Sequence, residues 1–180
     1  GDLTMNSDGS YSYTVTDESL AQGAIGTETF SYVVTDEHGA TDTTTLTIDI
    51  TGLNDDPVAY SDSNTASDDS IPASGNVLSN DSDIDNGAML DVKSVNGSDV
   101  GGDSTITVNG SYGDLTMNSD GSYSYTVTDE ALAQGETVTE TFSYVVTDEH
   151  GATDTATLSI DITGQNDAPF ANDDVIAVDE

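Results

Sequence analysis

Residues 141–147 read Thr-Phe-Ser-Tyr-Val-Val-Thr, and residues 156–163 read Ala-Thr-Leu-Ser-Ile-Asp-Ile-Thr. In both stretches apolar and polar side chains alternate, which is typical of antiparallel strands with one face in a core and the other in solvent. Between them, Asp148-Glu149-His150-Gly151 predicts a hairpin turn. This part of the chain therefore favours an all-β fold.

The same period of two continues toward the N-terminus. Residues 122–127, Ser-Tyr-Ser-Tyr-Thr-Val, alternate and follow a second turn at residues 118–121, in which Asp-Gly allows a positive φ. Tyr123 and Tyr125 would share one strand face, which indicates core. Further short strands are expected at residues 76–78, 89–92, 105–108 and 115–117. About seven or eight short strands with frequent turns predict an antiparallel Greek-key β-sandwich of the immunoglobulin-like or cadherin-like kind.

A long internal repeat organises the chain. Residues 1–59 recur at residues 113–171, 112 positions later, with 50 of the 59 residues identical. A repeat of this length is too long for a solenoid unit and suits whole domains arranged in tandem.

The polar segments LNDDP and QNDAP, which end in proline, are expected to be linkers between such domains. A half-module would leave a sandwich core uncovered, so the first segment is expected to pack against its neighbour, to pair with another chain, or to fray. The predicted division is the C-terminal half of a preceding module at 1–52, a linker at 53–57, a complete β-sandwich module at 58–164, a linker at 165–169, and the start of a following module at 170–180.

The charge is extreme. The chain has 35 Asp and Glu residues against a single Lys, Lys93, and a formal net charge of −34. Compact packing of so many carboxylates is opposed by their mutual repulsion unless cations bind among them. Calcium is the expected partner because it takes several carboxylate and carbonyl oxygens in flexible geometry. The alternative is an acidic surface adapted to high salt, without specific ion sites.

The composition also excludes several classes of protein. With no basic surface, nucleic acid and anionic membranes are not expected partners, and no apolar run is long enough to insert in a membrane. There is no Cys for disulfides or thiolate metal sites. No nucleophile motif or phosphate loop is present, and His38 and His150 occupy equivalent turns, so the chain is not expected to be an enzyme.

Residues 80–87, Asn-Asp-Ser-Asp-Ile-Asp-Asn-Gly, form the strongest candidate metal loop. Asp81, Asp83 and Asp85 stand at alternate positions before Asn-Gly, an arrangement in which alternate side chains can converge on one calcium ion. The closing Glu of an EF-hand is absent, and Lys93 follows instead, so the loop is of another type. A solvated Asp-rich turn is the alternative.

The linkers form a second candidate site, in which a calcium ion would be shared between consecutive modules. An acid pair follows each linker proline, and a polar flexible linker is the alternative. Asp148, in the turn 148–151, is a further candidate ligand. The other candidates are Asn54, Asp55, Asp56, Asp68 and Asp69, and in the second copy Asn166, Asp167, Asp179 and Glu180.

Four motifs together resemble the VCBS and bacterial cadherin-like repeats of giant adhesins of the repeats-in-toxin type. They are Gly75-Asn76-Val77-Leu78-Ser79-Asn80-Asp81, Ser94-Val95-Asn96-Gly97, Gly113-Asp114-Leu115-Thr116 with Asp120-Gly121-Ser122-Tyr123, and Asn166-Asp167-Ala168-Pro169. The resemblance implies an immunoglobulin-like or cadherin-like sandwich, calcium-rigidified linkers, and type I secretion to the bacterial cell surface. It also implies that Asn166, Asp167, Asp68 and Asp69 match the calcium positions of cadherin linkers and first strands.

The expected function is therefore a structural extender of a secreted surface adhesin in adhesion and biofilm formation, with calcium ions and neighbouring copies of the module as partners. One alternative is an adhesive module that binds an extracellular glycan or a cell surface, since Tyr11, Tyr13, Tyr123 and Tyr125 could stack on sugar rings. Another is a homotypic, cadherin-like contact between chains.

Overall fold

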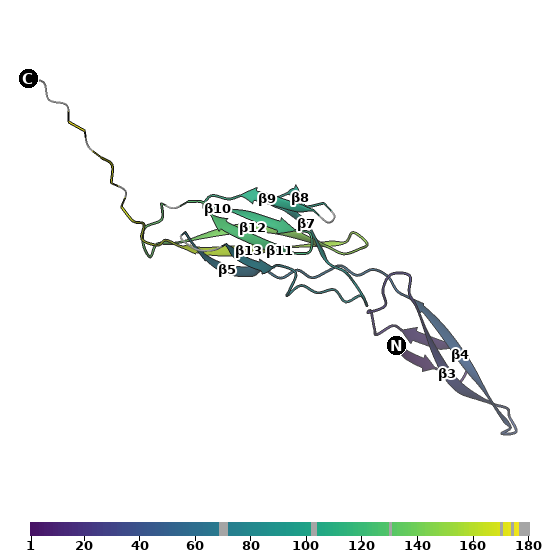
Figure 1. Ribbon diagram of the computed structural model, residues 1–180. Coiled ribbons are helices and arrows are strands. Elements are labelled where there is room, and N and C mark those ends of the chain that lie inside the picture. The colour runs from purple at the N-terminus through teal and green to yellow at the C-terminus, as the bar shows by residue number, and fades with distance from the viewer. Residues whose placement is uncertain (69–71, 102–103, 130, 170, 174, 177–180) are drawn as a thin grey trace, which may run out of the picture.

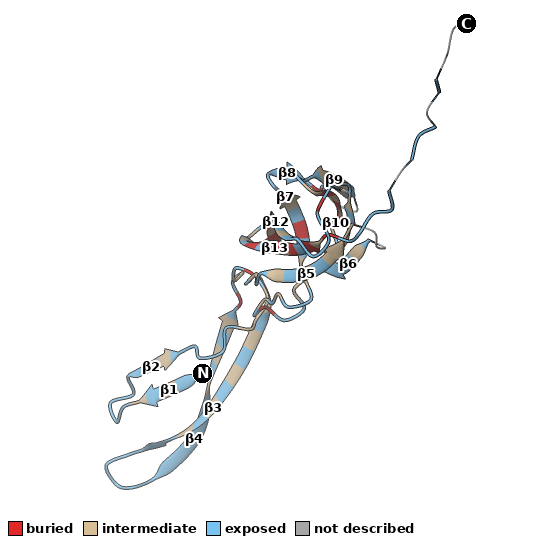
Figure 2. Cartoon of the chain, turned by 90° about the vertical axis from the view of Figure 1, so that its left-hand side faces the viewer, coloured by how far each residue is buried: buried red, intermediate tan, exposed pale blue. Residues whose placement is uncertain are grey.

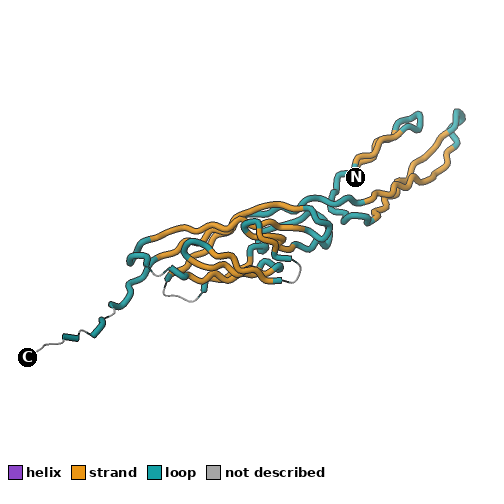
Figure 3. Tube along the Cα trace, turned by 90° about the horizontal axis from the view of Figure 1, so that it is seen from above, coloured by secondary structure: helices purple, strands orange, loops and turns teal. Residues whose placement is uncertain are grey.

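The computed structural model describes residues 1–68, 72–101, 104–129, 131–169, 171–173 and 175–176. Two hairpins lie toward the N-terminal end, and a β-sandwich follows them along the length of the molecule (Figure 1). Within these residues the secondary structure consists of strands, turns and loops, and no helix is present, as the tube in Figure 3 also shows. The expected all-β fold is confirmed.

The sandwich, here called the second unit, comprises residues 58–164 and has two sheets. The four-stranded sheet has the order β6-β11-β10-β9, and the five-stranded sheet has the order β5-β13-β12-β7-β8. All neighbouring strands are antiparallel except β5 and β13, which run parallel. The strands are β5 (Asp62–Ser67), β6 (Ala73–Asn76), β7 (Asp91–Val95), β8 (Ser98–Asp99), β9 (Thr105–Asn109), β10 (Gly113–Asn118), β11 (Ser122–Val127), β12 (Thr137–Thr147) and β13 (Thr153–Thr163).

Residues 1–52, here called the first unit, form two separate two-stranded sheets. One pairs β1 (Asp2–Met5) with β2 (Tyr11–Thr14), and the other pairs β3 (Ile25–Thr35) with β4 (Thr41–Thr51). Their registers repeat those of the second unit: Leu3 lies opposite Tyr13 as Leu115 lies opposite Tyr125. The repeated sequence therefore forms the same hairpins twice.

The buried core belongs to the second unit. Figure 2 shows buried residues on its strands, whereas β1 to β4 are exposed or of intermediate burial. Tyr123 and Tyr125 are buried, as their shared strand face predicts. The core consists of Val77, Val92, Val95, Val100, Leu115, Met117, Tyr123, Tyr125, Leu132, Phe142, Tyr144, Val146, Ala156, Leu158, Ile160 and Ile162.

Some expected strand positions need correction. The strand expected at 76–78 ends at Asn76, because Val77 leaves the ladder and donates its N–H to the Gly121 carbonyl over 3.0 Å. The strand expected at 89–92 runs instead from Asp91 to Val95, where it pairs with β12. β5 was not expected, since its sequence DSNTAS has no apolar alternation. No helix found among the described residues is long and apolar enough to cross a membrane.

Candidate metal centre

The linker at residues 53–57 packs against the hairpin turn that joins β12 to β13. The Asn54 side-chain amide donates to Asp148 Oδ2 over 2.7 Å and to the Asp55 carbonyl over 2.9 Å. Asp148 is only 6% exposed, and its Oδ1 accepts the backbone N–H groups of His150 and Ala152. The turn thus fixes one carboxylate oxygen and presents the other to the linker.

The loop at residues 81–87 approaches the same linker. The Asp55 N–H donates to Asp85 Oδ2 over 3.1 Å, and the Asp85 N–H donates to Asp83 Oδ1 over 2.9 Å. Asp85 is 6% exposed, and both its Oδ1 and Asp83 Oδ2 are inaccessible to solvent and have no hydrogen-bond partner. Buried polar atoms are normally satisfied, so these two oxygens are candidates for binding a cation.

The first unit contributes a loop to this junction. The backbone N–H of Asn86 donates to the Ser19 carbonyl over 2.9 Å, and its side-chain amide contacts Ser19 Oγ at 3.2 Å. Ser19 is in turn held by Asp17 Oδ1, which accepts its N–H and hydroxyl. Both units therefore meet beside the candidate metal loop.

The surroundings of Asp148 favour the ionised form of its carboxyl group. Burial raises the pKa of Asp148, but hydrogen bonds from Asn54, His150 and Ala152 outweigh that effect and hold the pKa below its ordinary value. A carboxylate that remains charged while buried is suited to bind a cation, because the cation supplies the missing opposite charge.

Asp81 has partners of its own. Its Oδ1 accepts the Tyr60 N–H over 2.7 Å, and its Oδ2 is inaccessible and has no hydrogen-bond partner. Burial raises the pKa of Asp81, and the negative charges of Asp62 and Asp154 raise it further. All three alternate Asp side chains of residues 81–85 therefore carry a carboxylate oxygen that is inaccessible and has no hydrogen-bond partner.

The second linker lies at the opposite end of the sandwich from the first (Figure 1). The Gln165 N–H donates to Asp68 Oδ1 over 2.7 Å, which places Asp68 beside the start of that linker. Asn166 donates to the Asp167 carbonyl over 3.1 Å, the same local turn that Asn54 makes with Asp55. Asp56 is exposed. Asp69, Asp179 and Glu180 lie outside the described residues.

The donor chemistry at the first linker fits a hard cation. Within the described ranges, no group of three His, Cys, Asp or Glu side chains is already arranged to hold a metal ion. The site would therefore need the Asn54 amide oxygen and backbone carbonyls beside the carboxylates of Asp83, Asp85 and Asp148. Calcium accepts such mixed oxygen ligands in flexible geometry, and thiolate or imidazole metals do not match this set.

Sequence reasoning missed three participants of these groups. Asp62 and Asp154 lie on strands, outside any acidic run, and only the parallel pairing of β5 with β13 brings them near Asp81. Ser19 lies in the loop after β2 and carries no charge. The sequence feature that could have pointed to Ser19 is the turn Asp17-Glu18-Ser19 before Leu20. The same turn recurs in the second copy, where Asp129 precedes Leu132.

The fold and the linker at residues 53–57 place the chain in a class of protein: all-β domains of the sandwich type, with acidic side chains at the linker between successive units. Residues 54–164 match the bacterial cadherin-like domain, and residues 1–49 match a bacterial immunoglobulin-like (Ig) domain. The chain belongs to the bacterial cadherin-like domain family.

The chain is also similar to a curated protein. The chain is 35% identical over 174 residues to the calcium-binding lectin RapA2 of Rhizobium johnstonii, and the match covers 91% of this chain and 72% of the relative. The matched families and this relative are described by binding or structural roles rather than by a catalysed reaction.

Proposed function

We propose that this chain is a calcium-binding structural segment of a bacterial surface adhesin, in which calcium at the linker 53–57 holds one β-unit against the next. The proposal is supported by the hydrogen bonds at this linker, from Asn54 to Asp148, from the Asp55 N–H to Asp85 and from the Asp85 N–H to Asp83. It is also supported by the inaccessible oxygens of Asp83 and Asp85 that have no hydrogen-bond partner. The name of the calcium-binding relative supports the choice of ion.

Asn54 can present either of its side-chain amide atoms to Asp148. Rotation of the Asn54 amide by 180° would turn its oxygen, rather than its NH₂ group, toward Asp148, and a shared cation would favour that orientation. The ion would also supply positive charge beside the buried carboxylates of Asp85 and Asp148. Binding would thus fix the linker and both loops to one point.

The physiological role that we infer is an extender. A folded, calcium-bound string of such modules would project the ligand-binding end of a secreted adhesin of the VCBS and repeats-in-toxin kind away from the cell, as in biofilm formation. At a calcium concentration of about 100 times the dissociation constant, one site specific for the folded state adds about 2.7 kcal/mol to its stability. Without calcium, the charge of −34 would favour expanded states.

Thermal unfolding followed by circular dichroism tests the binding step. The chain is melted in EDTA, in millimolar Ca²⁺, and in Mg²⁺ at matched ionic strength. The proposal expects a large increase in Tm with Ca²⁺ alone, and a loss of most of that increase in Asp85→Asn and Asp148→Asn. Asp36→Asn is the matched control, because Asp36 makes the same turn hydrogen bonds to His38 and Ala40 in the first unit. Equal stabilisation by Mg²⁺ or by simple salt would mean charge screening and would refute a specific site.

A distance measurement tests the rigidity of the linker. The chain has no Cys, so Thr29→Cys and Thr141→Cys, both at exposed strand positions, give one spin label in each unit. Calcium should narrow the distribution of distances between the labels. A distribution of the same width in EDTA and in calcium would argue against an extender that calcium stiffens.

A second candidate is calcium-dependent carbohydrate binding, which the relative's description as a lectin favours. Tyr123 and Tyr125 are not available for it, since both are buried. Tyr60, 54% exposed and three residues after the linker proline, is the better candidate for stacking on a sugar ring. Specific hits on a glycan array in calcium, lost in Tyr60→Ala, would favour this function over the extender.

A further inference from the structure

The first unit reproduces only half of the second. β1 to β4 correspond to β10 to β13 with the same pairing, but in the second unit each of those four strands has one more neighbour. β9 pairs with β10, β6 with β11, β7 with β12, and β5 with β13. Among the described residues, the corresponding edges of β1 to β4 are not paired with any strand.

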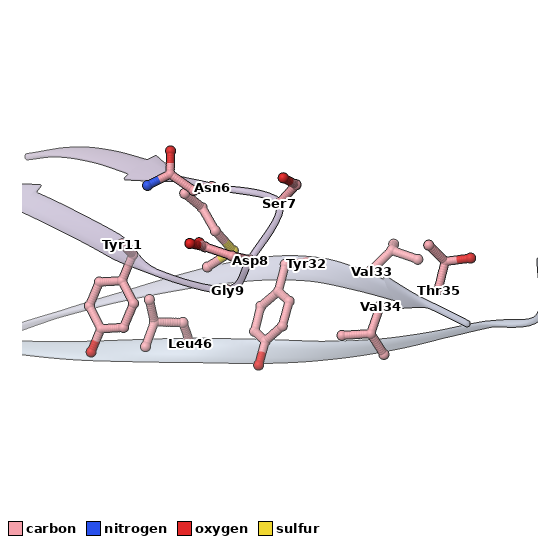
Figure 4. A pocket seen from close by; sticks show the side chains of 11 residues that line it. Asn6, Ser7, Asp8, Gly9, Tyr11, Tyr32, Val33, Val34, Thr35 and Leu46 are labelled. Carbon is pink, nitrogen blue, oxygen red and sulfur yellow. The ribbon is translucent and has the colours of Figure 1, made fainter. Parts of the chain in front are cut away.

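The inner faces of these hairpins are apolar and uncovered. Tyr11 is 55% exposed, whereas its counterpart Tyr123 is 7% exposed; Val34 is 51% exposed, whereas Val146 is fully buried. Between the β1–β2 turn and β3–β4 lies a hollow of about 600 Å³, lined by Met5, Tyr11, Tyr32, Val34 and Leu46 among others (Figure 4). Every one of these five residues recurs, unchanged, in the core of the second unit.

The second unit shows what fills this space. A Cβ placed on Gly121 would lie 2.6 Å from Leu78 Cγ, whereas a Cβ placed on the corresponding Gly9 would meet nothing within 4 Å. The N–H of Val77 donates to the Gly121 carbonyl over 3.0 Å, and the N–H of Val92 donates to the Ser119 carbonyl over 2.7 Å. The segment that covers β10 to β13 therefore comes from residues 58–112.

We infer that the first unit is a docking surface for a half-module of the kind formed by residues 58–112, supplied by the polypeptide that precedes residue 1. The inference rests on the uncovered face and on its filled counterpart, and does not depend on calcium. Tyr112 directly precedes Gly113, and Gly1 corresponds to Gly113, so the same connection can deliver the covering half to β1.

The surface also specifies the sequence of its partner. A Cβ at Gly75 would lie 2.9 Å from the Tyr123 ring, so glycine is required opposite Tyr11. The Tyr144 hydroxyl has the Asp62 carboxylate as an acceptor at 2.7 Å and the Tyr60 carbonyl at 2.9 Å, so an Asp on the partner's first strand would match Tyr32. The partner is therefore expected to have glycine opposite Tyr11, and a sequence like that of residues 62 and 75–78 would fit the surface.

Docking would also change calcium binding at the first linker, an expectation that rests on the proposed calcium site. Asp68 of the covering half accepts the N–H of Gln165, whose counterpart in the first unit is Leu53. A docked half-module would bring an equivalent carboxylate next to Asn54. Calcium affinity at the first linker should then rise when the first unit is completed.

The test extends the full chain by a second copy of residues 58–112 joined directly before Gly1. Hydrogen exchange is measured in EDTA by mass spectrometry, with β12–β13 as the internal standard for a covered hairpin. Amides of β3–β4 should exchange about 100-fold more slowly in the extended chain than in the 180-residue chain. The control extension carries Gly75→Val and Val77→Asp in the added copy alone and should give no such protection.

Three outcomes would overturn the inference. β3–β4 could exchange equally fast with and without the extension while β12–β13 stay protected. The control extension could protect as well as the unaltered one, which would mean unspecific coverage. The 180-residue chain could already show protected β3–β4 and sediment as a dimer, in which case a second copy is the partner. Because calcium is absent from this experiment, its result is independent of the fate of the calcium proposal.

Discussion

The two copies of the repeat have nearly the same sequence and very different surroundings. Phe30 and Phe142 illustrate the difference: each packs edge-on against a Tyr of the neighbouring hairpin, at ring centroid distances of 6.1 and 5.9 Å. Phe142 is 1% exposed, and Phe30 is only partly buried. Local sequence thus sets the hairpins and their aromatic contact, whereas burial depends on the other half of the sandwich.

This contrast separates two contributions to stability within one molecule: the pairing of strands in a hairpin and the covering of the hairpin's apolar face. Hairpins alone are marginal in water, and a sheet becomes independently stable when its apolar face is covered. Residues 113–164 have that cover and residues 1–52 do not, so equivalent substitutions in the two copies measure what the cover contributes.

The largest effect is expected from the aromatic pair itself. Phe142→Ala should lower the free energy of unfolding of the second unit by about 3–5 kcal/mol, because it opens a cavity in a closed core. Phe30→Ala should leave that transition within about 0.5 kcal/mol of the unsubstituted chain, as for an exposed position. Urea unfolding followed by tyrosine fluorescence measures both. Equal losses from the two substitutions would show that the first unit is as well packed as the second.

A smaller difference is expected at a buried carboxylate. Glu140 is 8% exposed and accepts the Tyr125 hydroxyl over 2.6 Å and the N–H of Ser111. Glu140→Ala leaves these donors without an acceptor and should cost about 1–3 kcal/mol. At Glu28, the corresponding residue, the side chain is 35% exposed, so Glu28→Ala should cost less. Glu140→Gln keeps an acceptor and serves as the control; a loss as large as that of Glu140→Ala would contradict this explanation.

How much of this could be predicted from the sequence depends on the range of the interactions. Alternation within residues 141–147 and 156–163 was enough for β12 and β13, because a half-covered strand carries its own pattern. β5 has no such pattern and forms because β13 offers it a parallel edge and Tyr144 a hydrogen bond to Asp62. A polar strand that depends on distant partners leaves no local signal.

The candidate metal centre shows the same limit. The loop 81–87 was a local signal, and Asp83 and Asp85 do lie at the linker. Alternate spacing placed Asp81 with them, and the structure adds a contact that spacing does not encode: the Asp81 carboxylate accepts the N–H of Tyr60. That Asn54 meets Asp148 depends on the path of the linker across the end of the sandwich, which residue spacing does not encode.

The decline of Tm at acidic pH, measured in EDTA, gives a third comparison, between Asp148 and its counterpart Asp36. Because the folded state holds the pKa of Asp148 below the ordinary 3.8, this group stabilises the fold above that pH, and the contribution is lost as the pH falls further. Asp148→Asn should therefore flatten the decline of Tm below about pH 4. Asp36→Asn is the matched control, since Asp36 has the turn hydrogen bonds without one from Asn54. An acid limb of Asp148→Asn that superimposes on that of the unsubstituted chain would contradict the assignment.

The smallest effect is expected where the two copies have the same surroundings. Thr27 donates to Asp49 over 2.8 Å, and Thr139 donates to Asp161 over 2.6 Å, and all four residues are exposed. Removal of either hydroxyl, in Thr27→Ala or Thr139→Ala, should change stability by no more than about 0.5 kcal/mol, because water replaces an exposed hydrogen bond. Hydrogen exchange of the flanking amides should change by the same small factor in both copies. Both Thr–Asp pairs lie on the outer face of their hairpins, away from the cover of the inner face. A clearly larger effect at Thr139 than at Thr27 would therefore mean that the two units differ in more than that cover.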